Sequence, residues 1–480
     1  AAAGDGALPA VELHVREARF ANADAEGRLQ ARWRTGPAPD GHLPGVLDLQ
    51  GRLTRADATR TWRYLPASIP ADVRDYVRRA VIEGRSRDVE FAVQGDLRQF
   101  PFADPRQGTF RIASRVEDAR FAYAPPDDGE PAGWPAFTDV HGLLVFEGTA
   151  MHIRDARARL YGFQLQQVHG GIADLSHDPQ LVLDGQGQGP LADALRFVRE
   201  TPIDGWTQHA LAQASGSGAA HLKLGVRIPL DHMDAARVDG EVTLQGNEVQ
   251  ITPDTPRMAQ ARGVVRFSDR GFSIQGGAAR VLGGMASFEG GTQKDGTLRF
   301  SGRGVATAEG LRQARELGVV PYLGEHLQGQ AGYRVGLDIV RGLPELTIHS
   351  DLVGLAMALP APLAKPAEAA WPLAVRTMLR PAVPGQPARD SIAVLLSDVL
   401  ELRYERLRQD DGWRVVAGAV GIGTPAPELL EAIRAIATRD AVTYRLCLTA
   451  LTTAQHELAQ QRQCDELAAR IRQTHPALLE

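Results

Sequence analysis

The sequence contains a motif that recurs after 121 residues. Residues 141–162 read HGLLVFEGTAMHIRDARARLYG, and residues 262–283 read RGVVRFSDRGFSIQGGAARVLG. At this offset six pairs of residues match: Gly142 with Gly263, Phe146 with Phe267, Ile153 with Ile274, Ala158 with Ala279, Arg159 with Arg280, and Gly162 with Gly283. Self-similarity at a fixed spacing is typical of repeat architectures, in which each unit buries its apolar face only against its neighbours. The chain is therefore predicted to form a long surface rather than a compact pocket.

The repeated unit has the composition of β-structure. Short alternating runs of Val, Ile, Leu and Phe are interrupted by Gly and Asp, and the chain of 480 residues contains 50 glycines and 30 prolines. Such a content of turn residues favours many strands joined by short connections. A hydrophobic fraction of 44% is ordinary for a folded protein. The predicted fold class is mainly β: a long, repetitive antiparallel sheet with a few short helices and a helical C-terminal tail.

Three parts follow from the pattern along the chain. Residues 1–190 are predicted to be the N-terminal part of the β-groove body, with a short helix near 70–84. Residues 191–425 are predicted to continue its repeats, with helices near 191–199 and 308–317. Residues 426–480, rich in Ala, Gln, Glu and Leu at helical spacing, are predicted to be a helical tail. Because the sequence opens on Ala1 rather than Met, we expect it to be a piece of a longer protein.

The clearest strand in the sequence spans residues 221–230. It places five aliphatic side chains on one face and His, Lys, Gly, Arg and Pro on the other; the five are Leu222, Leu224, Val226, Ile228 and Leu230. Alternation of this length indicates a strand with one dry and one wet face. Two interpretations share the pattern: the buried face of an ordinary β-sandwich, and a groove whose dry face stays open to an apolar ligand.

Charge and cysteine content exclude several classes of protein. The formal net charge of −5 leaves no basic footprint for nucleic acid. Only two cysteines occur, Cys447 and Cys464, which supports neither a disulfide scaffold nor a zinc site. The longest apolar stretch, residues 352–364, has 13 residues and contains two prolines, whereas a membrane-spanning helix needs about 20.

Catalytic spacings are missing from the sequence. The run HELAQ at residues 456–460 lacks the second histidine of a zinc protease motif. The glycines of residues 185–189 are followed by Pro190 and lack a dinucleotide-binding context. The thirteen histidines are scattered, and no paired carboxylates stand out. We therefore predict that the chain is not an enzyme, with no catalytic residues, no cofactor and no metal site.

Several strings resemble a known family when they are read in order. They are WRYLP at residues 62–66, QFPF at 99–102 with GTF at 108–110, GWP at 133–135, and SDLVGLAMALPAPLAKP at 350–366. Together they resemble the YhdP family, which comprises AsmA-like envelope lipid-transport proteins. The resemblance covers roughly residues 40–425 and corresponds to the central portion of the family's long chain. Residues after Pro427 do not resemble it.

The resemblance implies a protein of the periplasm, anchored to the inner membrane in its full-length form, that serves outer membrane biogenesis. The implied fold is a long curved sheet with an apolar groove. The implied role is non-enzymatic carriage of phospholipid along this groove between the inner and outer membranes. Its implied partners are phospholipid and the inner membrane, through an anchor that is not in this chain, and not nucleic acid. The alternative is a structural or scaffolding envelope protein with a closed β core that acts through protein partners.

The groove candidates are the aliphatic and aromatic positions of the strands described above and of the segment after residue 350: Leu222, Leu224, Val226, Ile228, Leu230, Phe146, Phe267, Ile153, Ile274, Leu355, Met357 and Leu359. Residues 359–366 contain three prolines, which remove three backbone donors. We therefore expect this stretch to leave the sheet as a loop at the groove rim. There Lys365 is predicted to meet a lipid phosphate.

Overall fold

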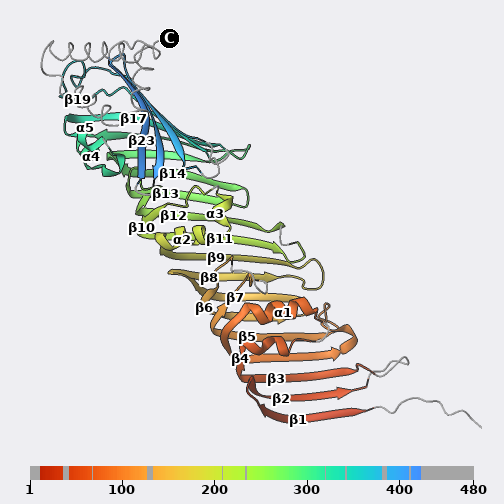
Figure 1. The fold of residues 1–480 in the computed structure, drawn as a ribbon. Helices are drawn as coiled ribbons and strands as arrows, with labels where there is room; N and C mark the ends of the chain where they lie inside the picture. Colours follow the sequence, from red (N-terminus) through yellow and green to blue (C-terminus); the bar gives the residue numbers. More distant parts are fainter. Residues whose placement is uncertain are drawn as a thin grey trace, which may run out of the picture. The chain divides into compact units, whose positions relative to one another are not determined.

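The computed structural model describes ten stretches of the chain: residues 11–35, 43–66, 69–126, 133–207, 209–232, 235–318, 320–340, 343–380, 386–409 and 412–422. Within them, 23 strands form an antiparallel sheet that does not close on itself, accompanied by a few short helices (Figure 1). The predicted mainly β fold class is confirmed. The predicted helical tail, residues 426–480, lies outside the described residues.

The chain divides into two compact units. Unit 1 comprises residues 1–212, 216–247 and 264–272, and unit 2 comprises residues 213–215, 248–263 and 273–480. The long strands up to β12 belong to unit 1: β1 Glu12–Ala21, β2 Ala25–Arg34, β3 Val46–Asp57, β4 Val81–Asp96, β5 Gly108–Phe121, β6 Phe137–Glu147, β7 Ala150–Leu160, β8 Phe163–Ile172, β9 Gln180–Pro190, β11 Ala219–Pro229 and β12 Arg237–Gln250. Each pairs with the next, and β9 pairs with β11.

The short strand β10 (Ser215–Ser217) and β13 (Met258–Ser268) pass from one unit to the other. The remaining strands lie in unit 2, except for the start of β14: β14 Gly271–Val281, β15 Gly283–Thr292, β16 Leu298–Thr307, β17 Leu327–Val340, β18 Leu343–Ser350, β19 Leu355–Met357, β20 Leu373–Leu379, β21 Arg389–Leu396, β22 Leu400–Gln409 and β23 Gly412–Ile422. Here β17 pairs with β16, β18 and β19, and β18 pairs with β20.

The helices occur at regular intervals. The helix α1 (Ala71–Ala80) follows β3, α2 (Leu191–Glu200) follows β9, and α4 (Ala308–Gln313) follows β16, so that they begin 120 and then 117 residues apart. They match the helices predicted near 70–84, 191–199 and 308–317. The other helical turns are short: η1 Ala58–Arg63, η2 Leu97–Gln99, α3 Ile203–Trp206, η4 Arg315–Leu317 and α5 Val320–Gly324. Six long strands separate α1 from α2, and six separate α2 from α4.

The recurring motif has a counterpart in this arrangement. The strands β6 and β7 share all four of their end positions with β13 and β14 once 121 residues are added. Gly142 and Gly263 occupy equivalent places, because a Cβ on either would lie 3.0 Å or less from the backbone or side chain of the following strand, at Ala156 and Gly277 respectively. Glycine is needed at both positions by this close approach.

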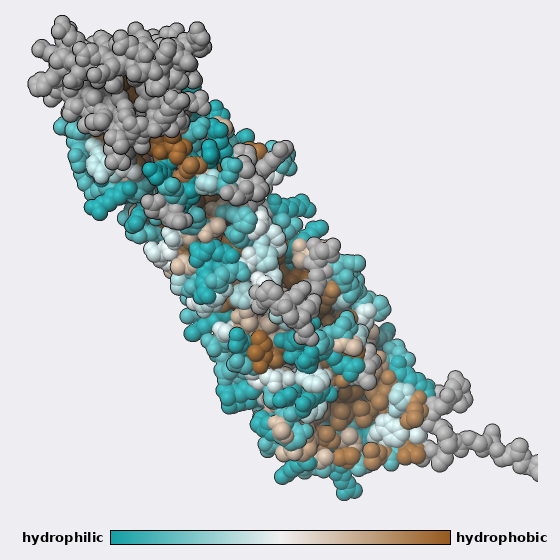
Figure 2. All heavy atoms as spheres, in the orientation of Figure 1, coloured by the Kyte–Doolittle hydropathy of each residue, from teal (hydrophilic) through white to brown (hydrophobic). Residues whose placement is uncertain are grey.

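Cross-strand register gives the sheet two chemically different faces. Leu222, Leu224 and Val226 of β11 lie opposite Gly187, Gly185 and Leu183 of β9 and opposite Val242, Gly240 and Val238 of β12. We call the face that carries these side chains the inner face. Hydrophobic side chains gather on one area over β1 to β4 and are bordered by hydrophilic ones (Figure 2).

The opposite, outer face carries charged side chains that pair between neighbouring strands. Arg52 and Asp88 approach to 2.6 Å, and Arg299 of β16 and Asp338 of β17 to 2.7 Å. Such exposed ion pairs contribute about 0–1 kcal/mol each. They add little to stability, but charged side chains keep the outer face in water, so that only the inner face can be dry.

Aromatic rings on the inner face cover glycines of the adjacent strand. This arrangement occurs in five places, where the ring of one residue lies over a glycine: Phe91 over Gly51, Phe267 over Gly240, Phe288 over Gly277, Phe300 over Gly290 and Tyr333 over Gly304. In each case a Cβ on the glycine would collide with the ring. The ring occupies the space that a side chain would otherwise fill, an arrangement known to compensate glycine in strands.

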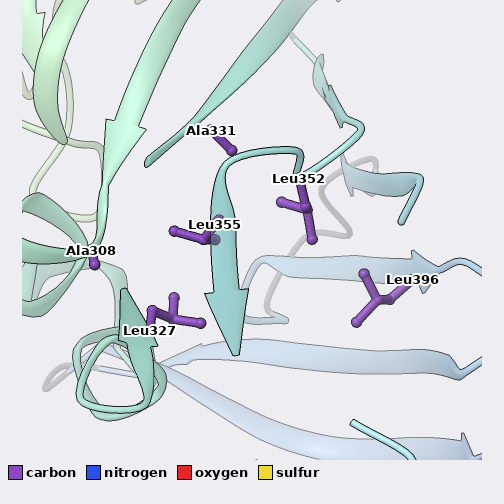
Figure 3. Close-up of a cluster of buried hydrophobic side chains, with 6 residues drawn as sticks. All are labelled: Ala308, Leu327, Ala331, Leu352, Leu355 and Leu396. Carbon is purple, nitrogen blue, oxygen red and sulfur yellow. The ribbon is translucent and has the colours of Figure 1, made fainter. Parts of the chain in front are cut away.

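Residues 351–372 leave the ladder and fold over one end of β17. A buried hydrophobic cluster forms there from five segments (Figure 3): Ala308, Leu327, Ala331, Leu352, Leu355 and Leu396. Leu363 and Trp371 pack against it. As expected, the proline-rich stretch 359–366 is not part of a strand, and a single bridge between Met357 and Lys365 closes it into a loop.

The amine of Lys365 holds this loop from inside. Its Nζ donates hydrogen bonds to the backbone oxygens of Leu352 and Leu355, both at 2.8 Å, and to that of Pro366 at 3.1 Å. The residue is only 2% exposed. Burial lowers the pKa of the Lys365 amine, and the carboxylates of Glu368 and Asp351 oppose this shift. The rim role predicted for Lys365 is therefore wrong, because its three N–H groups are already bound to backbone oxygens and cannot meet a phosphate.

Replacing Gly304 by alanine should destabilise unit 2, because the new Cβ would lie 2.7 Å from the Tyr333 hydroxyl and 2.8 Å from Cβ of Ala286. We expect a loss of about 1–3 kcal/mol in the free energy of unfolding, measured by chemical denaturation. Gly332→Ala on the neighbouring strand is the matched control, since its Cβ meets nothing nearer than 3.9 Å. Equal effects of the two substitutions would contradict the packing argument.

Lys365→Met should loosen the segment 351–372, because three buried backbone oxygens lose a charged donor. We expect a loss of about 2–4 kcal/mol in the free energy of unfolding. The control is Lys294→Met, which removes an exposed lysine from the turn between β15 and β16. A Lys365→Met variant as stable as the Lys294→Met variant would show that the amine does not hold the loop.

Candidate functional site

One row of inner-face residues crosses ten strands of unit 1. Each member lies directly opposite the next in the ladder: Ala18, Leu29, Gly51, Phe91, Ile112, Phe146, Met151, Ile172, Leu181 and Ile228. The row contains no charged or polar side chain. At ~4.8 Å per strand it extends roughly 40 Å along the sheet, whereas the acyl region of one membrane leaflet is about 15 Å deep.

A second row runs beside the first. It consists of Leu144, Ile153, Gly170, Leu183, Val226 and Val238, again in direct register. The two rows place four predicted residues from two distant parts of the sequence on one face: Phe146 and Ile153 of the β6–β7 hairpin, and Val226 and Ile228 of β11. Leu222 and Leu224 extend that face along β11.

Phe267 joins the same face from the repeated motif. Its ring covers Gly240, and Gly240 lies opposite Leu224 on the inner side of β11 and β12. Phe146 and Phe267, which match each other in the sequence repeat, therefore point to the same side of unit 1. Their shared direction agrees with the strand pattern that the repeat predicts.

The inner face is covered only in part. Leu222, Leu224, Val226 and Ile228 are all half-buried, and in the ten-strand row only Ile172 is fully buried. Among the described residues, the largest side chains with less than 2% exposure are Val145 and Asn247. In a β-sandwich the large aliphatic residues between two sheets would be fully buried.

Unit 2 has an inner face of the same kind. Its row crosses nine strands and contains the predicted Ile274: Ile274, Gly290, Phe300, Leu337, Leu346, Thr377, Ile392, Tyr404 and Gly418. A parallel row of Val335, Ile348, Val375, Val394, Leu402 and Val420 lies beside it. Ile274 is half-buried.

The other predicted residues lie in different surroundings. Leu230 follows the end of β11 and is 40% exposed. Leu355 is 4% exposed inside the cluster of Figure 3, so a ligand reaches it only if that cluster opens. Met357 packs against the same cluster, and Leu359 is half-buried in the loop that follows β19.

Sequence reasoning missed the polar groups of the inner face. Ser86 and Ser114 satisfy each other there through a hydroxyl–hydroxyl hydrogen bond of 2.7 Å. Asp390 and Arg406 form a two-pronged ion pair at one end of β21 and β22, with Nε of Arg406 3.0 Å from Oδ1 of Asp390. The sequence around Asp390 and Arg406 does not distinguish these two charges, because Arg389 precedes Asp390, while Glu405 and Arg408 lie beside Arg406.

Two features do not occur in the described part of the chain. No group of three or more His, Cys, Asp or Glu side chains in these residues is placed to hold a metal ion. Among the same residues, no helix has the length and apolar character needed to cross a membrane.

Comparison with known proteins agrees with this architecture. Residues 7–439 match the protein family described as "YhdP protein". The chain is 25% identical over 346 residues to the intermembrane phospholipid transporter YhdP of Escherichia coli (strain K12). This match covers 71% of the chain but 26% of the relative, so the chain spans about a quarter of the length of that protein. No solved structure matches the chain significantly.

The family match extends over nearly all of the described residues, and it includes every strand of both units. It agrees with the resemblance read from residues 62–66, 99–110, 133–135 and 350–366. It also supports the prediction that the chain is not an enzyme, since the relative is described as a transporter. The chain belongs to the YhdP family.

Proposed function

We propose that the chain carries phospholipid along the inner face of its sheet, as part of a protein that moves lipid between the two membranes of a bacterial envelope. The relative is named an intermembrane phospholipid transporter. The observation that carries the proposal is the uncharged ten-strand row from Ala18 to Ile228 in unit 1, whose large side chains other than Ile172 stay half-buried.

The energetics of lipid transfer favour such a surface. Each methylene that leaves an apolar environment for water costs about 0.8 kcal/mol, so a two-chain lipid needs a dry surface along its whole path. The row offers an apolar residue at every strand step rather than one pocket. A lipid that moves by one strand exchanges similar contacts for similar contacts, which keeps the barrier between positions low.

The alternating faces also support a path that is wet on one side. An acyl chain would lie against the inner face, while the headgroup would remain in water beyond the edges of the strands. The ion-paired outer face would stay hydrated throughout. We place this activity in the periplasm, with the membrane anchor supplied by parts of the protein outside this chain.

The same observation weighs against the alternative of a scaffold with a closed β core. A closed core requires that the inner-face residues be sealed by a second layer. Large buried side chains are instead scattered along the described residues, as at Phe102, Phe163 and Leu298, and they gather into a cluster around Leu327, Leu355 and Leu396. That cluster is a local closure at the end of β17.

Val226→Asp tests the proposal at the centre of unit 1. In an open face water reaches the carboxylate, so we expect the melting temperature to fall by only a few degrees while bound phospholipid drops severalfold. In a closed core the same unpaired charge would cost several kcal/mol and prevent folding. Melting temperature and bound phospholipid are to be measured together on the purified chain, the latter by native mass spectrometry.

The matched control is His221→Asp, which places a carboxylate on the outer face of the same strand, where His221 is already exposed. It should leave both lipid content and stability near those of the wild type. Cooperative loss of structure in Val226→Asp alone would favour the closed core. An intact fold with undiminished lipid would reject carriage at this strand.

A photoreactive benzoylphenylalanine reports directly which face meets lipid. Placed at Leu222 it should crosslink to phospholipid, and placed at Lys223, the next residue on the opposite face, it should not. The crosslinked adducts are identified by mass spectrometry after expression in a Gram-negative host. Equal labelling from both positions would contradict the assignment of the inner face as the lipid-bearing one.

A further inference from the structure

Two parts of unit 2 that are far apart in its strand ladder touch each other. Nε1 of Trp413 donates a hydrogen bond to Oδ2 of Asp254 at 2.7 Å, and a guanidinium nitrogen of Arg408 lies 3.4 Å from the same oxygen. Asp254 belongs to the connection 251–257 between β12 and β13, whereas Arg408 and Trp413 are near the turn between β22 and β23. These residues are 154 and 159 positions apart in sequence.

This contact requires the sheet of unit 2 to curl back on itself. Between β13 and β22 the ladder takes eight steps, which would separate the strands by roughly 38 Å in a flat sheet. The two segments also start from opposite ends of the strands. The connection 251–257 lies at the end where α4 and β17 meet, as the hydrogen bond from the Arg257 amide to Glu316 indicates. Gln409 and Gly412 lie at the other end of the strands, together with Val340 and Leu343.

The contact therefore passes across the inner face of unit 2. Leu379 lies two residues after Thr377 of the inner-face row, and its partner on β21 is Asp390. Asp390 in turn lies opposite Arg406, so Arg406 and Arg408, two residues later, are on the inner side. Trp413 is the direct partner of Arg408. Figure 1 shows β23 running across the direction of β14. The end of the β22–β23 hairpin thus lies over the apolar face.

The groups that make the contact form one connected network. Asp390 holds Arg406, whose guanidinium lies 5.0 Å from the ring centre of Trp413, while Arg408 lies 5.7 Å from it. The side chains of Asp254 and Arg408 are 38% and 36% exposed. The Arg406–Asp390 pair is buried on the hairpin side, but the link to Asp254 is accessible to water. Partly exposed ion pairs and cation–π contacts are individually weak, so this link can break without unfolding the sheet.

We propose that Asp254, Arg408 and Trp413 form a clasp that closes the inner face of unit 2 against sideways passage of a lipid. Opening of the clasp lifts the end of the β22–β23 hairpin away from residues 251–257 and uncovers a lateral exit from the face. This inference rests on the proposed lipid carriage. It adds a defined place at which a lipid already on the sheet is retained or released.

The opening of the clasp is measured first without lipid. Spin labels are placed on exposed residues beside the clasp, through Pro253→Cys and Gln409→Cys, in a chain whose native cysteines are replaced by Cys447→Ser and Cys464→Ser. Pulsed electron paramagnetic resonance should give a short, narrow distance distribution in the parent. Asp254→Ala and Trp413→Phe should each lengthen and broaden it. The control Glu345→Ala breaks an outer-face pair, whose atoms are 2.6 Å apart, and should leave the distribution unchanged.

Lipid exchange is measured next on the same variants. Vesicles of phosphatidylethanolamine and phosphatidylglycerol that carry a fluorescent phosphatidylethanolamine are mixed with the lipid-loaded chain. We expect Asp254→Ala and Trp413→Phe to exchange lipid up to about tenfold faster than the parent, because each substitution should lower the equilibrium constant for closing of the clasp by about tenfold. Thermal unfolding identifies any variant that fails to fold, and Arg408→Gln replaces such a variant.

The outcomes separate the inference from the function on which it rests. Unchanged label distances in the folded variants would overturn the clasp. Longer distances with unchanged exchange would overturn its role as a gate. If the wild-type chain carries no phospholipid at all, the transport proposal fails and the lipid gate fails with it, while the label distances still decide whether the contact opens.

Discussion

Cross-strand register is the constraint on which the rest of this structure depends. Because side chains alternate between faces, a shift of one residue at any strand would exchange the apolar and the charged face from that point onward. The ladder avoids this over ten strands of unit 1, from Ala18 to Ile228, although bulges interrupt β4 to β8. At most bulges the extra residue adopts a left-handed conformation, as at Asp88, Asp139 and Asp155, and the inner row resumes on the correct side. The bulges therefore bend the sheet without mixing its faces.

A face that stays half-open must be stabilised without a second layer. Part of this stabilisation comes from aromatic rings opposite glycines, because a ring lying on Gly51 or Gly277 buries apolar area between adjacent strands. The helices α1, α2 and α4 supply another part by closing one end of the sheet at intervals, with Ala80, Leu195 and Ala308 fully buried. Stability is thereby spread along the ladder in local contacts, as in other repeat proteins, and no central core is required.

The parts of the fold that sequence reasoning predicted are those set by local pattern. The helix predicted near residues 70–84 corresponds to α1, and the alternation of residues 221–230 located β11 with the correct faces. Lys365 shows where such reasoning stops. Among prolines it reads as a lone surface cation, and only the path of the chain brings the oxygens of Leu352 and Leu355 around its amine. Leu355 was assigned to the open face for the same reason, since no local signal separates a strand that lines a face from one that covers its end.

Neither local pattern nor the path of one loop predicts the contact of Asp254 with Trp413, because this contact depends on the twist that accumulates over many strands. Each pair of strands is rotated by about 20° relative to the next, so that over the eight steps between β13 and β22 the strand direction turns far enough to cross its starting direction. No pair of neighbouring strands records this, and the two residues are 159 positions apart. In unit 2 the sheet thereby covers part of its own inner face. The β22–β23 hairpin carries Arg406 and Arg408 on the side turned toward that face. The part of the apolar face that the hairpin covers is therefore also the part where arginine side chains meet it.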